Sequence, residues 1–482
     1  MQSALRTDAA RIAHLAWPVL VGQLAVLAFG TIDTVLLARQ SSTELAVLAV
    51  GSAAYITVFV GLMGVLLAIG PIVGQLFGAK RYEDAGRQFH QAVWLALFLS
   101  AGGCAVLAWP TPFLMLAQAE ESVAQGVRGY LGALAFALPA ALLFTVYRGF
   151  NTAISRPREV MRLQVLGLAF KLPLSMVLAW GVPSIGLPAL GAVGCGLATV
   201  IVMWLQCAAA AARLLRDPAY DRFALLGRGL DAPDRAMLAG LLKLGIPMGA
   251  GILIEVTGFT FMAIFIARLG ALPVAGHQIA ANLTAMLFMV PLALSNATST
   301  LVAQRLGARD LADATRLSWN GLKLATILAV LLASLLHLLK EPVVNLYTRD
   351  ATVAAVALAL LGWVVWFHVA DAIQTMAALV LRAYRVATWP VVIYAVSLWG
   401  LGLGGGYVLA FSGEAGASGF WLTSTLALWT SAALLVALMA WVIRQRALDE
   451  GALSLEPVSP QPNSQPAGSS AGPSAGSSAG AG

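Results

Sequence analysis

Three carboxylates interrupt the long apolar stretches of this 482-residue chain: Asp33, Glu255 and Asp371. The remaining acidic residues, out of 22 in total, lie in loops, at the ends of apolar runs or in the terminal regions. A carboxylate near the centre of a bilayer costs about 2.5 to 3.5 kcal/mol on insertion scales, so its presence there indicates a partner or a function. Such a group must be protonated, or neutralised by a bound cation or a basic side chain, and this suits it to cation exchange.

Glu255 and Asp371 are expected at a similar depth. Glu255 follows Lys243 by about 12 residues, Asp371 precedes Arg382 by about 11, and a helix rises ~1.5 Å per residue, so both lie roughly 16 to 18 Å from the same membrane surface. Asp371 shares its helical face with four residues one turn away: Phe367, His368, Gln374 and Thr375. His368 could act as a proton relay, although a packed neutral imidazole is the simpler interpretation.

Lys171 is the one basic residue well inside an apolar run. It follows Arg162 by about 9 residues, which places it roughly 14 Å deep, too far for a snorkelling side chain. It could neutralise Asp33 across the first half of the chain. Counted from the loops, the two residues differ in depth by several helical turns, although Pro18 and Pro173 could bend the helices enough to bring them together.

The composition indicates an all-α integral membrane protein. Hydrophobic residues make up 60% of the chain and charged residues only 11%, against about 25% charged in ordinary soluble domains. Twelve apolar segments of helix length begin near Leu15, Val47, His90, Gly129, Val160, Pro188, Leu241, Val274, Leu317, Thr352, Trp389 and Phe420. The first of these runs is too long for a cleavable signal peptide, and we expect it to be the first span.

Other polar and reactive residues have simpler interpretations. The net charge of +7 comes from basic residues scattered over short loops, so nucleic-acid binding is not expected. The three cysteines have no metal-type spacing and are expected to pack in the bundle. Four further histidines lie near span ends and are expected at the membrane interface: His14, His90, His277 and His337.

Lys and Arg gather in alternate connections, with a bias of roughly four to one that predicts cytoplasmic termini by the positive-inside rule. The two halves also resemble each other: WPVLVGQ from Trp17 aligns with IPMGAGI from Ile246, and GQLFGAKRYEDAGR from Gly74 with AQRLGARDLADATR from Ala303. One offset relates them without a gap, since 247 − 18 = 229 and 304 − 75 = 229. Six spans per half is an even number, so we expect two six-helix bundles related by a pseudo-two-fold axis along the membrane normal, with a central cleft.

The expected organisation has five parts. An N-terminal segment, 1–14, precedes a first bundle, 15–212; a cytoplasmic linker, 213–240, leads to a second bundle, 241–446. Residues 447–482 form a Pro/Gly/Ser/Ala-rich tail that we expect to be disordered.

Several motifs together resemble the MATE (multidrug and toxic compound extrusion) transporters, most closely the NorM-like branch, over about residues 10 to 445. They are TIDTVLLAR, GQLFGAKRYEDA, RGFNTAISRPREVM, GAVGCGLAT, IPMGAGILIE, AGHQIAANL and DAIQTMAALVLRAYR. The resemblance implies a non-enzymatic antiporter of a bacterial inner membrane that exports organic cations in exchange for Na⁺ or H⁺ and needs no other cofactor. We expect a monomer whose partners are its drug substrates and the membrane lipid.

The resemblance also implies site residues. Glu255 and Asp371 match the family's cation-binding acids, with Na⁺ as one possible ligand, and Asp33 matches its first-bundle acid. The residues expected to handle substrate or protons are Asp33, Lys171 and Ser175 in the first half and Gln278, Asn282, Phe367, His368 and Gln374 in the second.

Two departures from the family pattern stand out. NorM-like proteins usually have Asn where Lys171 and Ser175 stand, and relatives often have Tyr where Phe367 stands. We therefore expect coupling to reside in Glu255 and Asp371, with Asp33 silenced or retuned by Lys171.

Three alternatives remain at the level of sequence. A lipid-linked saccharide flippase of the same superfamily would need several interior cations, whereas this interior has three acids and one Lys. A membrane enzyme is suggested only by GASG, residues 416–419, which helix packing explains better. A channel lined by paired acids is possible, and exchange of a drug against an ion gradient would exclude it.

Overall fold

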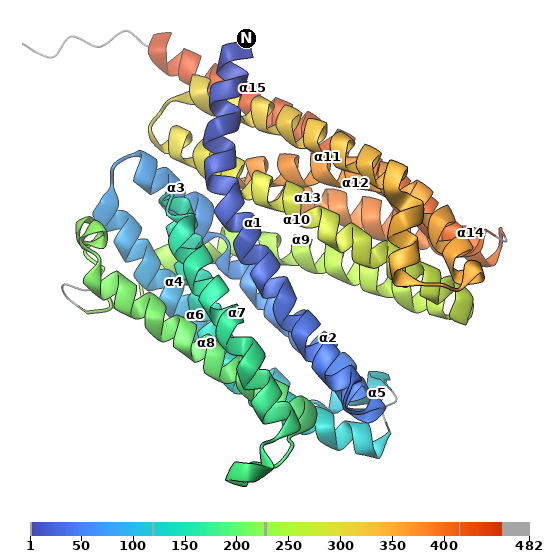
Figure 1. Ribbon diagram of the computed structural model, residues 1–482. Coiled ribbons are helices and arrows are strands. Elements are labelled where there is room, and N and C mark those ends of the chain that lie inside the picture. Colours follow the sequence, from blue (N-terminus) through green and yellow to red (C-terminus); the bar gives the residue numbers. More distant parts are fainter. Residues whose placement is uncertain (1, 118–119, 226–228, 414, 456–482) are drawn as a thin grey trace, which may run out of the picture.

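The computed structural model describes residues 2–117, 120–225, 229–413 and 415–455, and in these ranges the chain is built of helices (Figure 1). Twelve of the described helical stretches are long and apolar enough to cross a membrane. This confirms the all-α membrane architecture expected from the sequence.

The first half contains α1 to α8. The helices are α1 (Gln2–Ala38), α2 (Ser42–Leu66), α3 (Ile69–Gly78), α4 (Tyr82–Ala108), α5 (Thr111–Ala117), α6 (Glu121–Ala153), α7 (Pro157–Trp180) and α8 (Gly191–Arg216). Together α2 and α3 form one span, Ser42–Gly78. A short 3₁₀ turn, Pro218–Phe223, then leads toward the second half.

The second half contains α9 to α15. The helices are α9 (Arg235–Ala267), α10 (Ala271–Gly307), α11 (Leu311–Tyr347), α12 (Ala351–Ala383), α13 (Thr388–Tyr394), α14 (Gly405–Phe411) and α15 (Gly416–Leu455). A π-helical stretch, Ala395–Gly404, joins α13 to α14 within one span. Because α15 continues to Leu455, the expectation of a disordered tail from residue 447 is wrong for its first residues, and 456–482 lie outside the described ranges.

Equivalent loops of the two halves have the same backbone conformation. Lys80 and Arg309, which are 229 residues apart, both adopt the left-handed conformation, with φ of 59° each. Ser155 and Arg385 do the same in the next pair of loops, with φ of 62° and 61°. A left-handed residue after the last turn ends a helix and reverses the chain, so the internal repeat reappears in the turns that set the helix directions.

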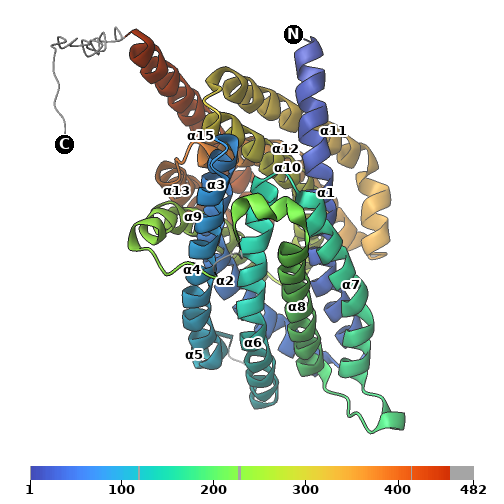
Figure 2. The same cartoon turned by 90° about the vertical axis from the view of Figure 1, so that its left-hand side faces the viewer.

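The two halves meet near the face that carries the beginning of α1 and the end of α15, which we call the terminal face (Figures 1 and 2). There, Ile12 and Leu15 of α1 share an apolar core with Leu301 of α10. Gly245 of α9 packs closely against the backbone of Val65 in α2. Away from this face the helices of the two halves diverge (Figure 1).

Candidate functional site

The first half holds a buried ion pair between Asp33 of α1 and Lys171 of α7. The Lys171 ammonium nitrogen lies 2.9 Å from each carboxylate oxygen of Asp33, and the two residues are 0% and 5% exposed. The same nitrogen donates to the Cys195 carbonyl oxygen at 2.9 Å and to the Thr199 hydroxyl at 2.8 Å. Ser175 donates its hydroxyl hydrogen to Asp33 at 3.1 Å.

These contacts leave Lys171 fully satisfied. An ammonium group has three N–H donors, and here a carboxylate, a carbonyl and a hydroxyl accept from it. The structure thus brings together Asp33, Lys171 and Ser175, although counting residues from the loops places the first two at different depths. The negative charge of Asp33 already has a fixed counter-charge.

The second half holds the two other acids on facing helices. Gln374 of α12 donates through its amide nitrogen to Asp371 Oδ1 at 3.1 Å and to Glu255 Oε1 of α9 at 3.4 Å. Its amide oxygen accepts from the Ser431 hydroxyl of α15 at 3.0 Å. Asp371 is 5% exposed, and Glu255 is half-buried.

Unlike Asp33, neither of these two acids forms an ion pair with a basic side chain among the described residues. Two carboxylates that share one amide donor in a bundle repel each other, and this repulsion is relieved when a proton or cation binds. We call Glu255 and Asp371 the acid pair, and Gln374 the bridge between them.

An aromatic cluster lies next to this site. Phe367, buried on α12, packs with its ring centroid 5.5 Å from that of Trp421 and 6.0 Å from that of Phe259. Trp421 donates its indole N–H to His277 Nδ1 at 3.2 Å. The His277 side chain, expected near a span end, is 2% exposed and packs inside the bundle.

Three other expected site residues lie apart from these networks. His368 is fully buried, and neither ring nitrogen has a hydrogen-bond partner in the described part of the chain. Gln278 and Asn282 lie one turn apart on an exposed face of α10. Within the described ranges no hydrogen bond joins these two side chains to the acid pair.

Two residues near Glu255 have no role in the sequence interpretation. Trp399, in the π-helical stretch, donates its indole N–H to the carbonyl oxygen of Ile254 at 3.0 Å. Arg382, used above to mark the end of a span, lines a cavity together with Gly251, which lies one helical turn from Glu255. Trp399 lies in no quoted motif. Arg382 lies within DAIQTMAALVLRAYR, on the same helix as Asp371, but its place at the end of a span gave no sign of a role at the acids.

The donor set at the acid pair suits a hard monovalent cation or a proton better than a transition metal. In the described part of the chain no group of three or more His, Cys, Asp or Glu residues is arranged to hold a metal ion. The two carboxylates provide oxygen ligands, which are the type that hard cations prefer.

A family model called MatE matches residues 18–177 and 247–408, which contain all the acids and bases of both sites. The chain belongs to the MatE family. A protein of Aromatoleum aromaticum named "Probable multidrug resistance protein NorM" is 42% identical over 91% of this chain and 94% of its own length. A protein of the same name from Neisseria meningitidis serogroup B is 32% identical over 87% of this chain and 91% of its own length.

Solved MatE-family structures share the fold. A MATE transporter in the bent conformation aligns with a TM-score of 0.83 and 17% identity, covering 94% of this chain and 98% of its own. A multidrug resistance MATE family transporter in its outward-facing conformation aligns with a TM-score of 0.81 and 17% identity, covering 91% of this chain and 96% of its own. The family resemblance expected from the motifs is thereby confirmed.

Proposed function

We propose that this MatE-family protein is a multidrug efflux antiporter that exports organic cations in exchange for Na⁺ or H⁺. The names of its relatives support the multidrug part of this proposal. The alternating Lys and Arg bias supports a bacterial inner-membrane orientation with the terminal face in the cytoplasm. A lipid-linked saccharide flippase is not favoured, because the one deeply buried lysine of the first half is already bound to Asp33.

We infer the coupling site from one observation: Gln374 bridges Glu255 and Asp371. A proton, a Na⁺ ion or an organic cation can each neutralise one negative charge of this pair, and their binding is mutually exclusive if they need the same carboxylates. Mutually exclusive binding at one site is the thermodynamic basis of exchange. The nearby ring of Phe259, which is partly exposed, offers additional contact for an organic cation.

Asp33 has a different role in this proposal. Its charge is held by Lys171, so exchanging cations there would require breaking a buried ion pair, and buried pairs are costly to break. Asp33 and Lys171 therefore act as a structural clamp between α1 and α7. In this proposal the first half lines part of the drug pathway but binds no second coupling ion.

The arrangement of the halves corresponds to one state of the transport cycle. Contact at the terminal face and divergence away from it describe an outward-open conformation if that face is cytoplasmic. We propose that the bundles 15–212 and 241–446 rock as units within a monomer, and that exchange of ligands at the acid pair biases the two conformations.

A transport assay with imposed gradients tests this function. We would reconstitute the wild type, Asp371→Asn and Asp33→Asn in proteoliposomes and follow a fluorescent organic cation with Na⁺ and pH gradients imposed separately. We expect gradient-driven transport in the wild type, its loss in Asp371→Asn and a smaller effect in Asp33→Asn. Equal or greater loss in Asp33→Asn would reject the assignment of coupling to the second half.

A further inference from the structure

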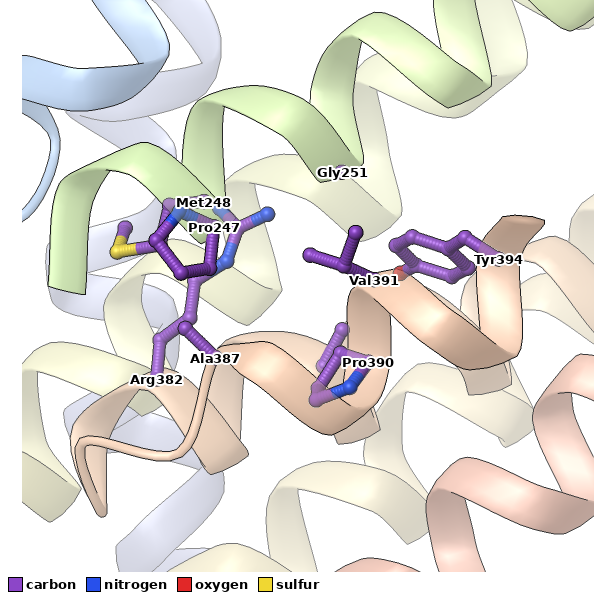
Figure 3. A pocket seen from close by; sticks show the side chains of 9 residues that line it. Pro247, Met248, Gly251, Arg382, Ala387, Pro390, Val391 and Tyr394 are labelled. Carbon is purple, nitrogen blue, oxygen red and sulfur yellow. The ribbon is translucent and has the colours of Figure 1, made fainter. Parts of the chain in front are cut away.

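A small cavity lies in the second half, between α9, α12 and α13, on the terminal-face side of the acid pair. It is lined by Pro247, Met248, Gly251, Ala378, Arg382, Ala387, Pro390, Val391 and Tyr394. Figure 3 shows the Arg382 side chain reaching from α12 across to Pro247 and Met248 of α9, with the Tyr394 ring on the opposite side. The cavity therefore contains one charged group, and that group is positive.

Helical spacing places this cavity in line with the acid pair. On α12, Asp371, Ala378 and Arg382 are separated by 7 and 4 residues, which keeps them on one face of the helix. On α9, Gly251 and Glu255 are 4 residues apart and also share a face. The two faces that hold the acids continue directly into the walls of the cavity.

The Arg382 guanidinium has no fixed partner of its own. Among the described residues its side chain makes no hydrogen bond or ion pair, although it is half-buried. It shares the cavity with Gly251, one helical turn from Glu255, and with the Tyr394 ring. The ionisable groups around Glu255 are thus Asp371 and Arg382 on α12 and Tyr394 on α13, while α15 contributes the neutral Ser431.

A coupling site needs to release its cation as well as bind it. Two carboxylates in a poorly hydrated bundle hold a cation strongly, because their attraction is little screened there. A tethered positive charge beside one carboxylate opposes that attraction and can take the place of the departing cation. Arg382 lies on the side of Glu255 toward the terminal face, where the proposed function requires the coupling ion to leave.

We propose that Arg382 is a positioning residue for cation exchange: its guanidinium competes with the coupling cation for Glu255 and so speeds release toward the terminal face. This inference rests on the proposed function, since it takes Glu255 and Asp371 as the coupling site. In this proposal the cavity is the space in which the Arg382 side chain moves toward or away from Glu255.

The test compares charge variants at this position in the full-length protein. Arg382→Gln removes the charge, Arg382→Lys keeps it, and Arg385→Gln removes an exposed arginine three residues further on as a matched control. In proteoliposomes we would measure drug transport against a Na⁺ series at fixed pH and against a pH series without Na⁺. Arg382→Met, which retains an apolar stem, provides a second neutral variant if Arg382→Gln folds poorly.

We expect the neutral variants to bind the coupling cation about tenfold more tightly, which corresponds to one pH unit for a proton, and to turn over more slowly. With Na⁺ this appears as a lower KM for Na⁺; with H⁺ the rate profile moves to higher pH, because the acids hold a proton more tightly without the positive neighbour. Arg382→Lys and Arg385→Gln should resemble the wild type.

Two outcomes overturn the inference, and they are distinguishable. If the neutral variants lose rate with unchanged KM and pH profile, or if Arg382→Lys is as impaired as Arg382→Gln, Arg382 is structural and the coupling site stands. If Asp371→Asn in the same assay retains gradient-driven transport, the coupling site itself is wrong and this inference fails with it. The Na⁺ affinities of the variants can also be compared without transport, from the rise in Tm that Na⁺ causes in each purified protein.

Discussion

Gly78 and Gly307 occupy equivalent positions in the two halves and make the same contact across the interface. A methyl group on Gly78 would overlap the carbonyl oxygen of Gln304, and one on Gly307 would overlap the carbonyl oxygen of Gln75. Both pairs are 229 residues apart, since 307 − 78 and 304 − 75 give the same number. The halves close at the terminal face because these two positions have no side chain.

Adding a side chain at either glycine should open the terminal face. Gly78→Val or Gly307→Val forces a branched side chain into a backbone contact, and overpacking of this kind costs about 1 to 3 kcal/mol. Spin labels at the exposed, equivalent positions Glu83 and Ala312 should then report longer and broader distances than in the parent protein.

Gly70→Val is the matched control for this experiment. Gly70 lies on α3 like Gly78, but no atom lies within 4 Å of a Cβ added there. If the label distances change equally for Gly70→Val, or remain unchanged for Gly78→Val, the glycine contact does not hold the closed face.

Removing one partner of the first-half ion pair should destabilise the fold. Lys171→Met leaves the Asp33 carboxylate buried without its counter-charge, and an uncompensated buried charge costs about 3 to 5 kcal/mol. We expect a clear fall in the apparent Tm of the purified protein at pH 8. The double variant Asp33→Asn/Lys171→Met should recover most of that loss, and a double variant less stable than Lys171→Met would contradict a clamp role for the pair.

Loss of the Gln374 amide should reduce transport more than loss of the Ser431 hydroxyl that donates to it. Gln374→Leu removes both hydrogen bonds to the acids, and losses of 10-fold to 100-fold are typical when a partner that orients ligands is removed. Ser431→Ala removes only the bond to the Gln374 oxygen and should reduce transport less. Measured as KM for the coupling ion, a larger effect of Ser431→Ala would argue against the bridge as the organising contact.

Lowering the pH should destabilise the loop after α8, because Asp217 then becomes protonated. The backbone N–H of Ala219, together with Arg156, holds the pKa of Asp217 below its usual value of 3.8. A carboxyl with a lowered folded-state pKa contributes stability above 3.8, and that contribution is lost as the pH falls through the lower folded value. In Asp217→Asn, Tm should fall less steeply than in the wild type as the pH is lowered through this window; parallel curves would show that the carboxylate contributes nothing.

Much of the architecture is determined locally and is therefore legible in the sequence. A span needs about 20 apolar residues whatever surrounds it, so the twelve spans follow from composition alone. The 229-residue offset links Lys80 to Arg309, and the structure gives both the same left-handed turn. The three interior acids could be identified because a charge in an apolar run is conspicuous regardless of its partner.

The partners of those acids depend on tertiary structure. Depth counted from the ends of spans separated Asp33 from Lys171. In the structure α1, which begins at Gln2, packs along α7, and the two charged groups meet at 2.9 Å. The offset carries no information on the sites themselves, since Asp33 corresponds to Met262 and Glu255 to Val26.

The sequence by itself determined that this chain has twelve membrane spans, a twofold repeat and three interior carboxylates, because hydrophobicity and periodicity are properties of single segments. Only the tertiary structure decided that Asp33 is neutralised by Lys171 and that Gln374 joins Glu255 to Asp371. It also decided that Arg382 shares a cavity with Gly251, on the terminal-face side of the acid pair. The physical reason is that the charge state of a buried acid depends on which helices cross beside it, and crossing angles are set by packing across the whole bundle.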